Sequence, residues 1–340
     1  MRKKWLERPW GFLTTFASLL LFVCAIVAIR DVYALLSLTH VTIPDMYAIV
    51  TSKGDSLKQE NGRTNILLLG SGGGTHEGSD LTDTIIIFSY SYASKSASLI
   101  SVPRDIWSET LKDKINSAFH YGEEKAKGGG YAMARAIVSE VTGIPLHYSV
   151  SMEFFGFKTV INTVGGIDVL VSQGFTDSEY PIEGKENDAC NGDPLYRCRY
   201  MTVVFIKGRE HMNGDRALAY VRSRHADGVE GTDFARSKRQ QEVLSALKSK
   251  FFDPQVWYSL ESIKNVYTSL DTAVNTDMAM KEIGILGKLF WLSERESIAK
   301  ISFEDLLMSP SEDLYEGRYV LLPQSGTFDA IHTYLKQKLQ

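Results

Sequence analysis

The chain has 340 residues, and its apolar fraction of 44% is ordinary for a globular protein with a real hydrophobic core. It carries 37 lysines and arginines against 41 aspartates and glutamates, so its net charge of −4 creates no field that would attract nucleic acid. Composition thus argues against a disordered or fibrous chain, and charge argues against a nucleic-acid partner.

The N-terminus predicts a membrane anchor. Arg2, Lys3, Lys4 and Arg8 precede a chargeless run over residues 11–29, and about 20 apolar residues suffice to cross a bilayer core. Because such cations stay cytoplasmic, we predict a cytoplasmic segment at residues 1–10, one transmembrane helix at 11–30, and an extracytoplasmic remainder. A cleaved signal peptide is the alternative, but the run is longer than the apolar core of such peptides and no clear small-x-small cleavage site follows.

A soluble α/β domain is predicted next. Residues 31–63 mix apolar pieces with proline, glycine and polar residues and are predicted to form a stalk, and the domain should span 64–335 with its core at 64–250. The apolar runs at 65–70, 84–90 and 97–102 predict strands buried on both faces of a sheet. Helical spacing of apolar residues at 129–141 and 153–164 predicts helices between strands.

The second half continues this alternation. A strand is predicted at 167–171, a polar surface insertion at 174–200, a short helix at 214–221 capped by Asn213, and a longer helix at 235–250. One strand-like run, residues 317–323, stands in the tail. The alternation of strands and helices predicts a three-layer α/β/α sandwich with a mixed central sheet.

The cysteines predict one disulfide. Cys24 lies in the apolar run, whereas Cys190 and Cys198 are eight positions apart in a polar loop. An exported compartment permits oxidation, so the pair is predicted to be bonded. Zinc binding is the alternative, but no CxxC motif or second nearby pair accompanies them.

The loop after the first strand, Gly70–Gly78, has backbone N–H groups that could cradle phosphate. It lacks the Gly-Lys-Ser/Thr ending of a nucleotide-binding loop, so a flexible or metal-adjacent loop is the better interpretation. Asp80 and Asp83 follow it and offer carboxylates to Mg²⁺, although either could instead cap a turn.

The segment Ala219–His225 predicts an anion site. Arg222 and Arg224, at i and i+2 in an extended or turning segment, point the same way and form a fork able to hold a diphosphate. Further cations and polar residues follow: Asp233, Arg236, Arg239, Gln240 and Gln241.

Charged residues also lie where predicted strands begin or end. Asp83 opens one strand, Arg104 directly follows another, and Lys114 comes shortly after. Ligands of α/β sheets gather at strand ends, which makes these residues site candidates. A structural ion pair with Asp105 or Asp83 is the alternative explanation for Arg104.

Eight ordered motifs make the chain resemble the LytR-CpsA-Psr family over about residues 64–250, with the tail as part of the same domain. They are Asn65-Ile-Leu-Leu-Leu-Gly70, Thr82-Asp83-Thr84, Ser101-Val-Pro-Arg-Asp105, Lys114-Ile-Asn-Ser-Ala118, Val164-Gly-Gly-Ile-Asp-Val169, His211-Met-Asn-Gly214, Ala217-Leu-Ala-Tyr-Val-Arg-Ser-Arg224 and Arg239-Gln-Gln241.

The resemblance implies a membrane-anchored, Mg²⁺-dependent (or Mn²⁺-dependent) phosphotransferase that moves a glycopolymer from a polyprenyl diphosphate carrier onto peptidoglycan. It implies that Asp83 binds the metal and that Arg104, Arg222 and Arg224 clamp the diphosphate. It also implies that Lys114, Asp233 and Gln240 are polar residues of the same pocket, and the residues after the arginine pair add Arg236 and Gln241 as substrate-binding candidates. Two departures concern the family's usual aspartate and arginine, which are replaced by Gly72 and Leu81; we hypothesise that His76, Glu77 or Asp80 compensates.

The mechanism we expect is attack of a wall-sugar hydroxyl on the phosphorus next to the glycan, with the arginines stabilising the leaving polyprenyl phosphate. Asp233 would accept the hydroxyl proton, or else orient Arg222 or Arg224. The alternatives are hydrolysis by a lipid pyrophosphatase and a non-catalytic module that binds or senses lipid-linked glycan.

Overall fold

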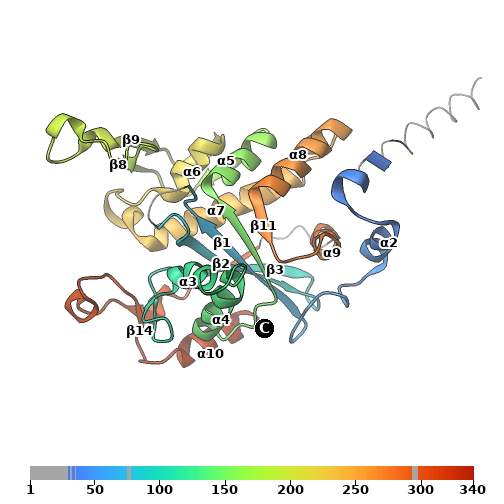
Figure 1. Cartoon of the computed structure of the whole chain (residues 1–340), viewed down its shortest axis with the longest axis horizontal. Helices are drawn as coiled ribbons and strands as arrows, with labels where there is room; N and C mark the ends of the chain where they lie inside the picture. Colours follow the sequence, from blue (N-terminus) through green and yellow to red (C-terminus); the bar gives the residue numbers. More distant parts are fainter. Residues whose placement is uncertain (1–29, 31–32, 35, 75–77, 293–297) are drawn as a thin grey trace, which may run out of the picture.

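The computed structural model describes residues 30, 33–34, 36–74, 78–292 and 298–340 (Figure 1). Apart from Arg30, the predicted transmembrane run lies outside these residues, as do His76 and Glu77. A search of the described helices finds none that has both the length and the apolar character needed to cross a bilayer.

A six-stranded mixed sheet forms the centre of the molecule. Its order is β11-β6-β1-β2-β3-β12, with parallel pairing between β1 and β6 and between β3 and β12, and antiparallel pairing elsewhere. The strands are β1 (Arg63–Ser71), β2 (Thr82–Ser91), β3 (Ser96–Ser101), β6 (Tyr148–Glu153), β11 (Val274–Thr276) and β12 (Ala299–Ile301). The apolar runs thus become β1, β2 and β3, the middle of the sheet.

Helices cover both faces of this sheet. On one face, Leu67, Ile87 and Ile100 pack against α3 (Ala118–Lys125), α4 (Gly130–Thr142) and α10 (Asp329–Lys338). On the other face, Ile66 and Tyr148 pack near Leu286 of α9 (Met280–Leu292), and α7 (Asp233–Phe251) reaches β2 and β3 through hydrogen bonds. The predicted α/β fold with a mixed central sheet is therefore confirmed.

A second hydrophobic core lies beside α7. It is built from α5 (Phe154–Thr163), α6 (Gly214–Arg222), α8 (Leu260–Ala273) and two antiparallel ribbons, β7 (Ile167–Val171) with β10 (Gly208–Met212) and β8 (Phe175–Pro181) with β9 (Tyr200–Phe205). The predicted strand at 167–171 exists, but it lies outside the central sheet and alternates buried with exposed residues. Figure 1 shows the β8–β9 ribbon projecting at one end of the molecule.

Asn213 caps α6 as predicted, because its Oδ1 accepts a hydrogen bond of 2.9 Å from the Arg216 N–H. The predicted helices at 129–141, 153–164 and 235–250 correspond to α4, α5 and α7. The run at 317–323 is a correction: it forms a strand only at β14 (Leu322–Pro323), because Gly317, with φ at +75°, and Arg318 turn the backbone first.

The remaining elements are short. They are α2 (Ile43–Thr51), β4 (Trp107–Ser108), β5 (Asp113–Lys114), β13 (Leu307–Met308) and the 3-10 helices η1 (Ile115–Ser117), η2 (Cys190–Gly192), η3 (Arg197–Arg199), η4 (Gly228–Gly231), η5 (Pro254–Val256), η6 (Glu304–Leu306) and η7 (Glu312–Tyr315). Residues 43–51 of the predicted stalk form α2, which packs against α9. The division of the chain into anchor, stalk and domain stays a prediction.

Candidate functional site: an arginine-lined cleft

A cleft of about 210 Å³ lies where the start of β2, the end of α6 and the first turns of α7 meet. Its lining combines three arginines with one carboxylate and apolar walls: Asp83, Thr84, Phe154, Pro181, Val221, Arg222, Arg224, His225, Arg236 and Gln240. A smaller recess next to it shares Asp83, Arg236 and Gln240 and adds Arg104 and Asp105. Residues predicted from four separate segments therefore meet in one place.

The backbone at the start of β2 places Asp83 and Thr84 at the cleft. Gly70 of β1 lies opposite Thr84, and the register shifts immediately after it, between Gly70 and Ser71. A Cβ at Gly70 would lie 3.0 Å from the Cβ of Thr84, closer than side chains normally pack. Glycine at this position therefore lets β2 begin tight against β1, with Asp83 at the open edge.

Arg222 and Arg224 both line the cleft, in a segment that turns at the end of α6, one of the two conformations that we expected. Arg222 is the last residue of α6, and the backbone leaves the helical conformation at Ser223 (φ −52°, ψ 129°), after which Arg224 lines the same cleft. The Arg222 guanidinium carbon lies 4.5 Å from the centre of the Phe154 ring. Stacking on an aromatic face orients the guanidinium plane, whose edge carries the N–H groups that can bind an anion.

Arg239 holds the turn that carries these two arginines. Its side chain is only 2% exposed, and it donates hydrogen bonds to the carbonyls of Tyr220 (2.9 Å) and Ser223 (2.6 Å) and to Glu230. On the other side, the fully buried Asp177 accepts the backbone N–H of Arg224 at 3.0 Å. The loop backbone is therefore fixed from two sides before any ligand arrives.

Helix α7 presents alternate faces to the cleft and to the protein interior. Arg236 and Gln240 are one turn apart and both line the cleft, and the Gln240 amide donates to the Thr84 hydroxyl at 2.9 Å. Gln241 instead donates to Ser101 Oγ at 2.8 Å and is buried away from the cleft. Asp233 is the first residue of α7, and its side chain lies outside what the structure describes.

Arg104 and Lys114 form a charge network behind the cleft. Arg104 forms ion pairs with Asp83 and with Asp105, and Lys114 Nζ lies 2.8 Å from Asp105 Oδ1. Burial alone would raise the pKa of Asp105, but Arg104 and Lys114, with a contribution from Arg224, outweigh burial and hold the pKa below its ordinary value. Arg104 therefore forms the structural ion pairs and also lines the recess. Lys114 contacts Asp105 and does not line the cleft.

Asp80 pairs with a histidine of α3. Its carboxylate accepts a hydrogen bond of 2.6 Å from Nδ1 of His120 on α3, and it is absent from the lining of both the cleft and the recess. That hydrogen bond raises the pKa of His120 above its ordinary value. The prediction that Asp80 joins Asp83 as a metal ligand stays a prediction.

We expect Asp80→Ala to leave the metal dependence of activity unchanged and to lower the pKa of His120, because the protonated ring loses its acceptor. The pair stabilises the fold below the ordinary histidine pKa, and this stabilisation is lost as pH rises through the raised value. An NMR titration of His120 beside a metal titration of activity checks both statements. Weaker metal activation in Asp80→Ala would return Asp80 to the metal site.

The residues present fit a metal ion held by one carboxylate and a bound diphosphate. Oδ1 of Asp83 accepts a hydrogen bond from Arg104. The side chain is 41% exposed, so Oδ2 can serve as a metal ligand. Mg²⁺ is commonly bound through one or two carboxylates, substrate phosphates and water. Within the described part of the chain, the one cluster of three His, Cys, Asp or Glu ligands is elsewhere, at Asp188, Cys190 and Cys198.

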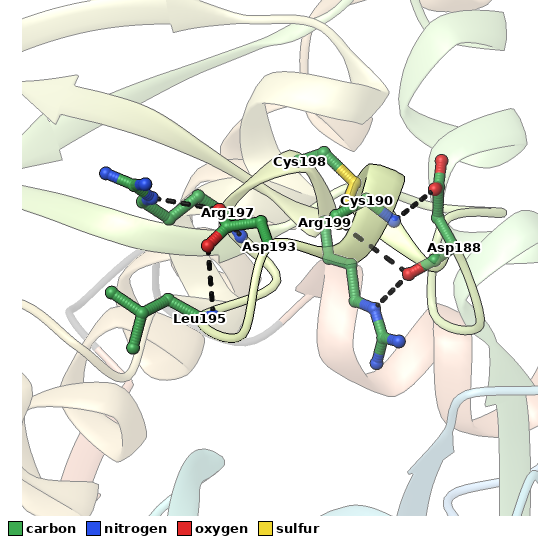
Figure 2. The surroundings of a disulfide bond; sticks show 7 residues. All are labelled: Asp188, Cys190, Asp193, Leu195, Arg197, Cys198 and Arg199. Atoms are coloured by element: carbon green, nitrogen blue, oxygen red, sulfur yellow. Dashed lines mark hydrogen bonds and ion pairs between the residues drawn. A yellow bond between two sulfur atoms is a disulfide. The ribbon is translucent and has the colours of Figure 1, made fainter.

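Cys190 and Cys198 are joined by a disulfide at the tip of the β8–β9 ribbon (Figure 2). Arg199 donates from Nε to the Asp188 carbonyl at 2.8 Å, and Asp193 pairs with Arg197 at 2.9 Å, so the closed loop is also cross-linked by polar contacts. The bonded sulfurs are not thiolates, which argues against zinc at this cluster.

Reduction of this disulfide should make the loop between Lys185 and Arg199 sensitive to trypsin while the rest of the domain resists cleavage. The bond limits the conformations of an exposed loop, and its loss permits local opening without global unfolding. Limited proteolysis of the Cys190→Ser/Cys198→Ser variant against a Cys24→Ser control measures the effect. Equal cleavage rates would show that the polar contacts suffice.

Two lining residues, Phe154 and Pro181, lie outside the segments from which the site was predicted. Phe154 and Phe155 are adjacent at the start of α5, and two neighbouring positions of a helix do not face the same side. The two rings therefore cannot both pack into the core. Phe155 is 71% exposed, and the ring of Phe154 stacks against the guanidinium group of Arg222. This aromatic pair was the available sequence signal for Phe154, and Pro181 gave none.

The α/β fold and the arginine-lined cleft fit the family that the sequence motifs indicated, and a comparison with family models gives the same family. A model described as the LytR_cpsA_psr family matches residues 39–337. The chain belongs to this family.

Two curated relatives are named as polyisoprenyl-teichoic acid–peptidoglycan teichoic acid transferases. TagV of Bacillus subtilis (strain 168) is 28% identical over 236 residues, which cover 69% of this chain and 55% of that protein. TagU of Bacillus mycoides (strain KBAB4) is 28% identical over 225 residues, which cover 64% of this chain and 62% of that protein. The match thus spans less than two thirds of each relative's length.

The crystal structure of B. subtilis TagV has the same fold. It superposes with a TM-score of 0.58 at 24% identity, covering 83% of this chain and 98% of that chain.

Proposed function

We propose that this chain is a membrane-anchored phosphotransferase that moves a glycopolymer from a polyprenyl diphosphate carrier onto a peptidoglycan hydroxyl and releases polyprenyl phosphate. The convergence of Arg222, Arg224 and Arg236 on one cleft with Asp83 carries the proposal. Membership of the family supports it, as do the names of TagV and TagU.

In the proposed reaction, the acceptor oxygen attacks the phosphorus that bears the glycan, and the bond from that phosphorus to the bridging oxygen breaks. The leaving polyprenyl phosphate gains negative charge, which the guanidinium groups of Arg222, Arg224 and Arg236 stabilise. Phosphoryl transfer depends mostly on positioning and on preorganised charge, and the buried network around Arg239 provides that preorganisation.

The cofactor we propose is Mg²⁺ or Mn²⁺, held by Asp83 and diphosphate oxygens, where it would neutralise phosphate charge. The acceptor proton is assigned to Asp233, which begins α7 one turn before Arg236. Arg104 keeps Asp83 in place through their ion pair.

The same proposal places the domain outside the cell membrane, with residues 1–10 cytoplasmic and residues 11–30 as a single membrane span. The sequence pattern supports the span, and the Cys190–Cys198 disulfide fits an oxidising compartment. The proposed partners are the lipid-linked glycan, the peptidoglycan acceptor and the membrane.

Product analysis tests the proposed reaction. The full chain, incubated with a labelled polyprenyl diphosphate-linked glycan and peptidoglycan, should yield wall-bound glycan and polyprenyl phosphate in equal amounts. Asp83→Asn should abolish both products, whereas Asp188→Asn, on the remote ribbon, should not.

Two results would contradict the proposal in different ways. Free glycan phosphate formed without an acceptor would indicate hydrolysis by a lipid pyrophosphatase. Binding of the lipid-linked glycan without any release would indicate a non-catalytic module.

A further inference from the structure

Helix α2 presents an apolar stripe to solvent. Four of its residues recur at helical spacing and are exposed by 76% (Ile43), 39% (Met46), 72% (Tyr47) and 70% (Val50). At 100° per residue these four side chains fall within one narrow face of the helix. A surface helix normally turns polar side chains outward, so this arrangement needs a partner.

The opposite face of α2 is the one that packs against the domain. A Cβ at Gly284 of α9 would lie 2.6 Å from Ile49 Cδ1, so the two helices touch closely there. The ammonium group of Lys288 donates hydrogen bonds to the carbonyls of Val50 and Ser52 at the end of α2. The apolar stripe therefore points away from the protein because α2 is fixed by its other side.

The charged side chain of α2 lies on a different face of the helix from the apolar stripe. Asp45 is its single charged residue, and it accepts hydrogen bonds from the backbone N–H and the hydroxyl of Thr42 at the helix start. Asp45 lies about 150° around the helix from the centre of the stripe, as the helical period dictates. No ionic side chain of α2 would thus have to leave water if the stripe were covered.

The residues that precede α2 indicate which partner covers the apolar stripe. Residues 31–42 alone separate α2 from the proposed span at 11–30, and even fully extended they reach only about 40 Å. Tyr33, in that connection, is also 73% exposed, and tyrosine favours the membrane–water interface. A short helix with one apolar face and no charge on it can lie in this interface with its apolar side chains at the acyl boundary.

We propose that α2 is an interfacial helix whose stripe of Ile43, Met46, Tyr47 and Val50 inserts into the outer surface of the lipid bilayer. The inference rests on the anchor of the proposed function and adds a second, defined membrane contact. Figure 1 shows α2 and the β8–β9 ribbon at opposite ends of the long axis, so this contact turns the ribbon away from the membrane. A fixed orientation of this kind holds the arginine cleft at a constant height above the lipid surface.

Site-specific fluorescence on the full chain in phospholipid vesicles tests the inference. In a Cys24→Ser background, where the other two cysteines are bonded, Val50→Cys carries an environment-sensitive dye and Leu314→Cys serves as the control. Leu314 is an apolar residue of η7 that is 74% exposed, close to the 70% of Val50. We expect blue-shifted emission at position 50 that is quenched by a lipid-borne quencher, and neither effect at position 314.

Three results would overturn the inference. Vesicle-bound protein with a water-exposed dye at position 50 contradicts the interfacial helix and leaves the anchor intact. A blue shift that lipid quenchers do not affect and that disappears at low protein density in the vesicles assigns the stripe to a second copy of the chain. Protein that does not float with the vesicles contradicts the anchor as well as the inference.

Discussion

Arg222→Ala should slow polyprenyl phosphate release by about 10²–10³-fold, the usual cost of removing one preorganised donor from an active site. Arg222 stacks on Phe154 at the cleft, so its fork is oriented before the diphosphate binds. Because negative charge grows on the leaving phosphate during reaction, we expect kcat to fall more than KM rises. Steady-state kinetics with a short-chain lipid-linked sugar measures both.

Arg222→Lys and Arg216→Ala are the matched controls. Lysine keeps the charge but lacks the planar fork, so an intermediate rate is expected. Arg216 lies on the same helix, but it pairs with Glu210 at 2.6 Å and stacks on Phe205, outside the cleft. An equal loss of rate in Arg216→Ala and Arg222→Ala would indicate damage to α6 instead of a lost diphosphate contact.

Arg239→Met should lower the free energy of unfolding by about 3–5 kcal/mol, the range found when one partner of a buried ionic network is removed. The substitution leaves the carbonyls of Tyr220 and Ser223 and the carboxylate of Glu230 without the guanidinium that binds them. Urea unfolding at neutral pH measures the loss.

Arg209→Met, at an exposed position of β10, is the control for Arg239→Met and should change stability by less than about 0.5 kcal/mol. Activity at a temperature where Arg239→Met remains folded should also fall, because the turn that carries Arg222 and Arg224 loses its support. Full stability in Arg239→Met would show that Asp177 alone fixes this turn.

The central strands could be predicted because each contains consecutive apolar residues. β1, β2 and β3 lie in the middle of a sheet covered on both faces, so the runs Ile66–Leu69 and Ile85–Phe88 and the pair Leu99–Ile100 are apolar on both sides of the strand. β6 was missed because the buried Ser149 and the partly buried Ser151 alternate with Tyr148, Val150 and Met152, which leaves no two neighbouring apolar residues. Ser149 tolerates burial because its N–H donates to Asp277 and its hydroxyl accepts from Arg135, and both partners are remote in sequence.

The site residues also fall into two groups. Some are indicated by their neighbours in the sequence, and the roles of others depend on contacts between distant parts of the chain. The arginine pair was visible because the chemistry is carried by neighbouring residues. Asp83 and Arg104 were candidates because they lie at strand ends, and the family motifs gave them roles. The roles of Asp80 and Gln241 depend on the contacts to His120 and Ser101, which only the fold creates. Sequence spacing alone could not distinguish Asp83, whose side chain lines the cleft, from Asp80, whose carboxylate pairs with His120.

A crystal structure of the protein with a short-chain prenyl diphosphate and Mg²⁺ would show directly whether the arginine-lined cleft is the diphosphate site. We predict both phosphorus atoms in the cleft, with Arg222, Arg224 and Arg236 around the phosphate oxygens and Asp83 on the metal. A diphosphate bound elsewhere on the protein while this cleft stays empty would contradict this prediction.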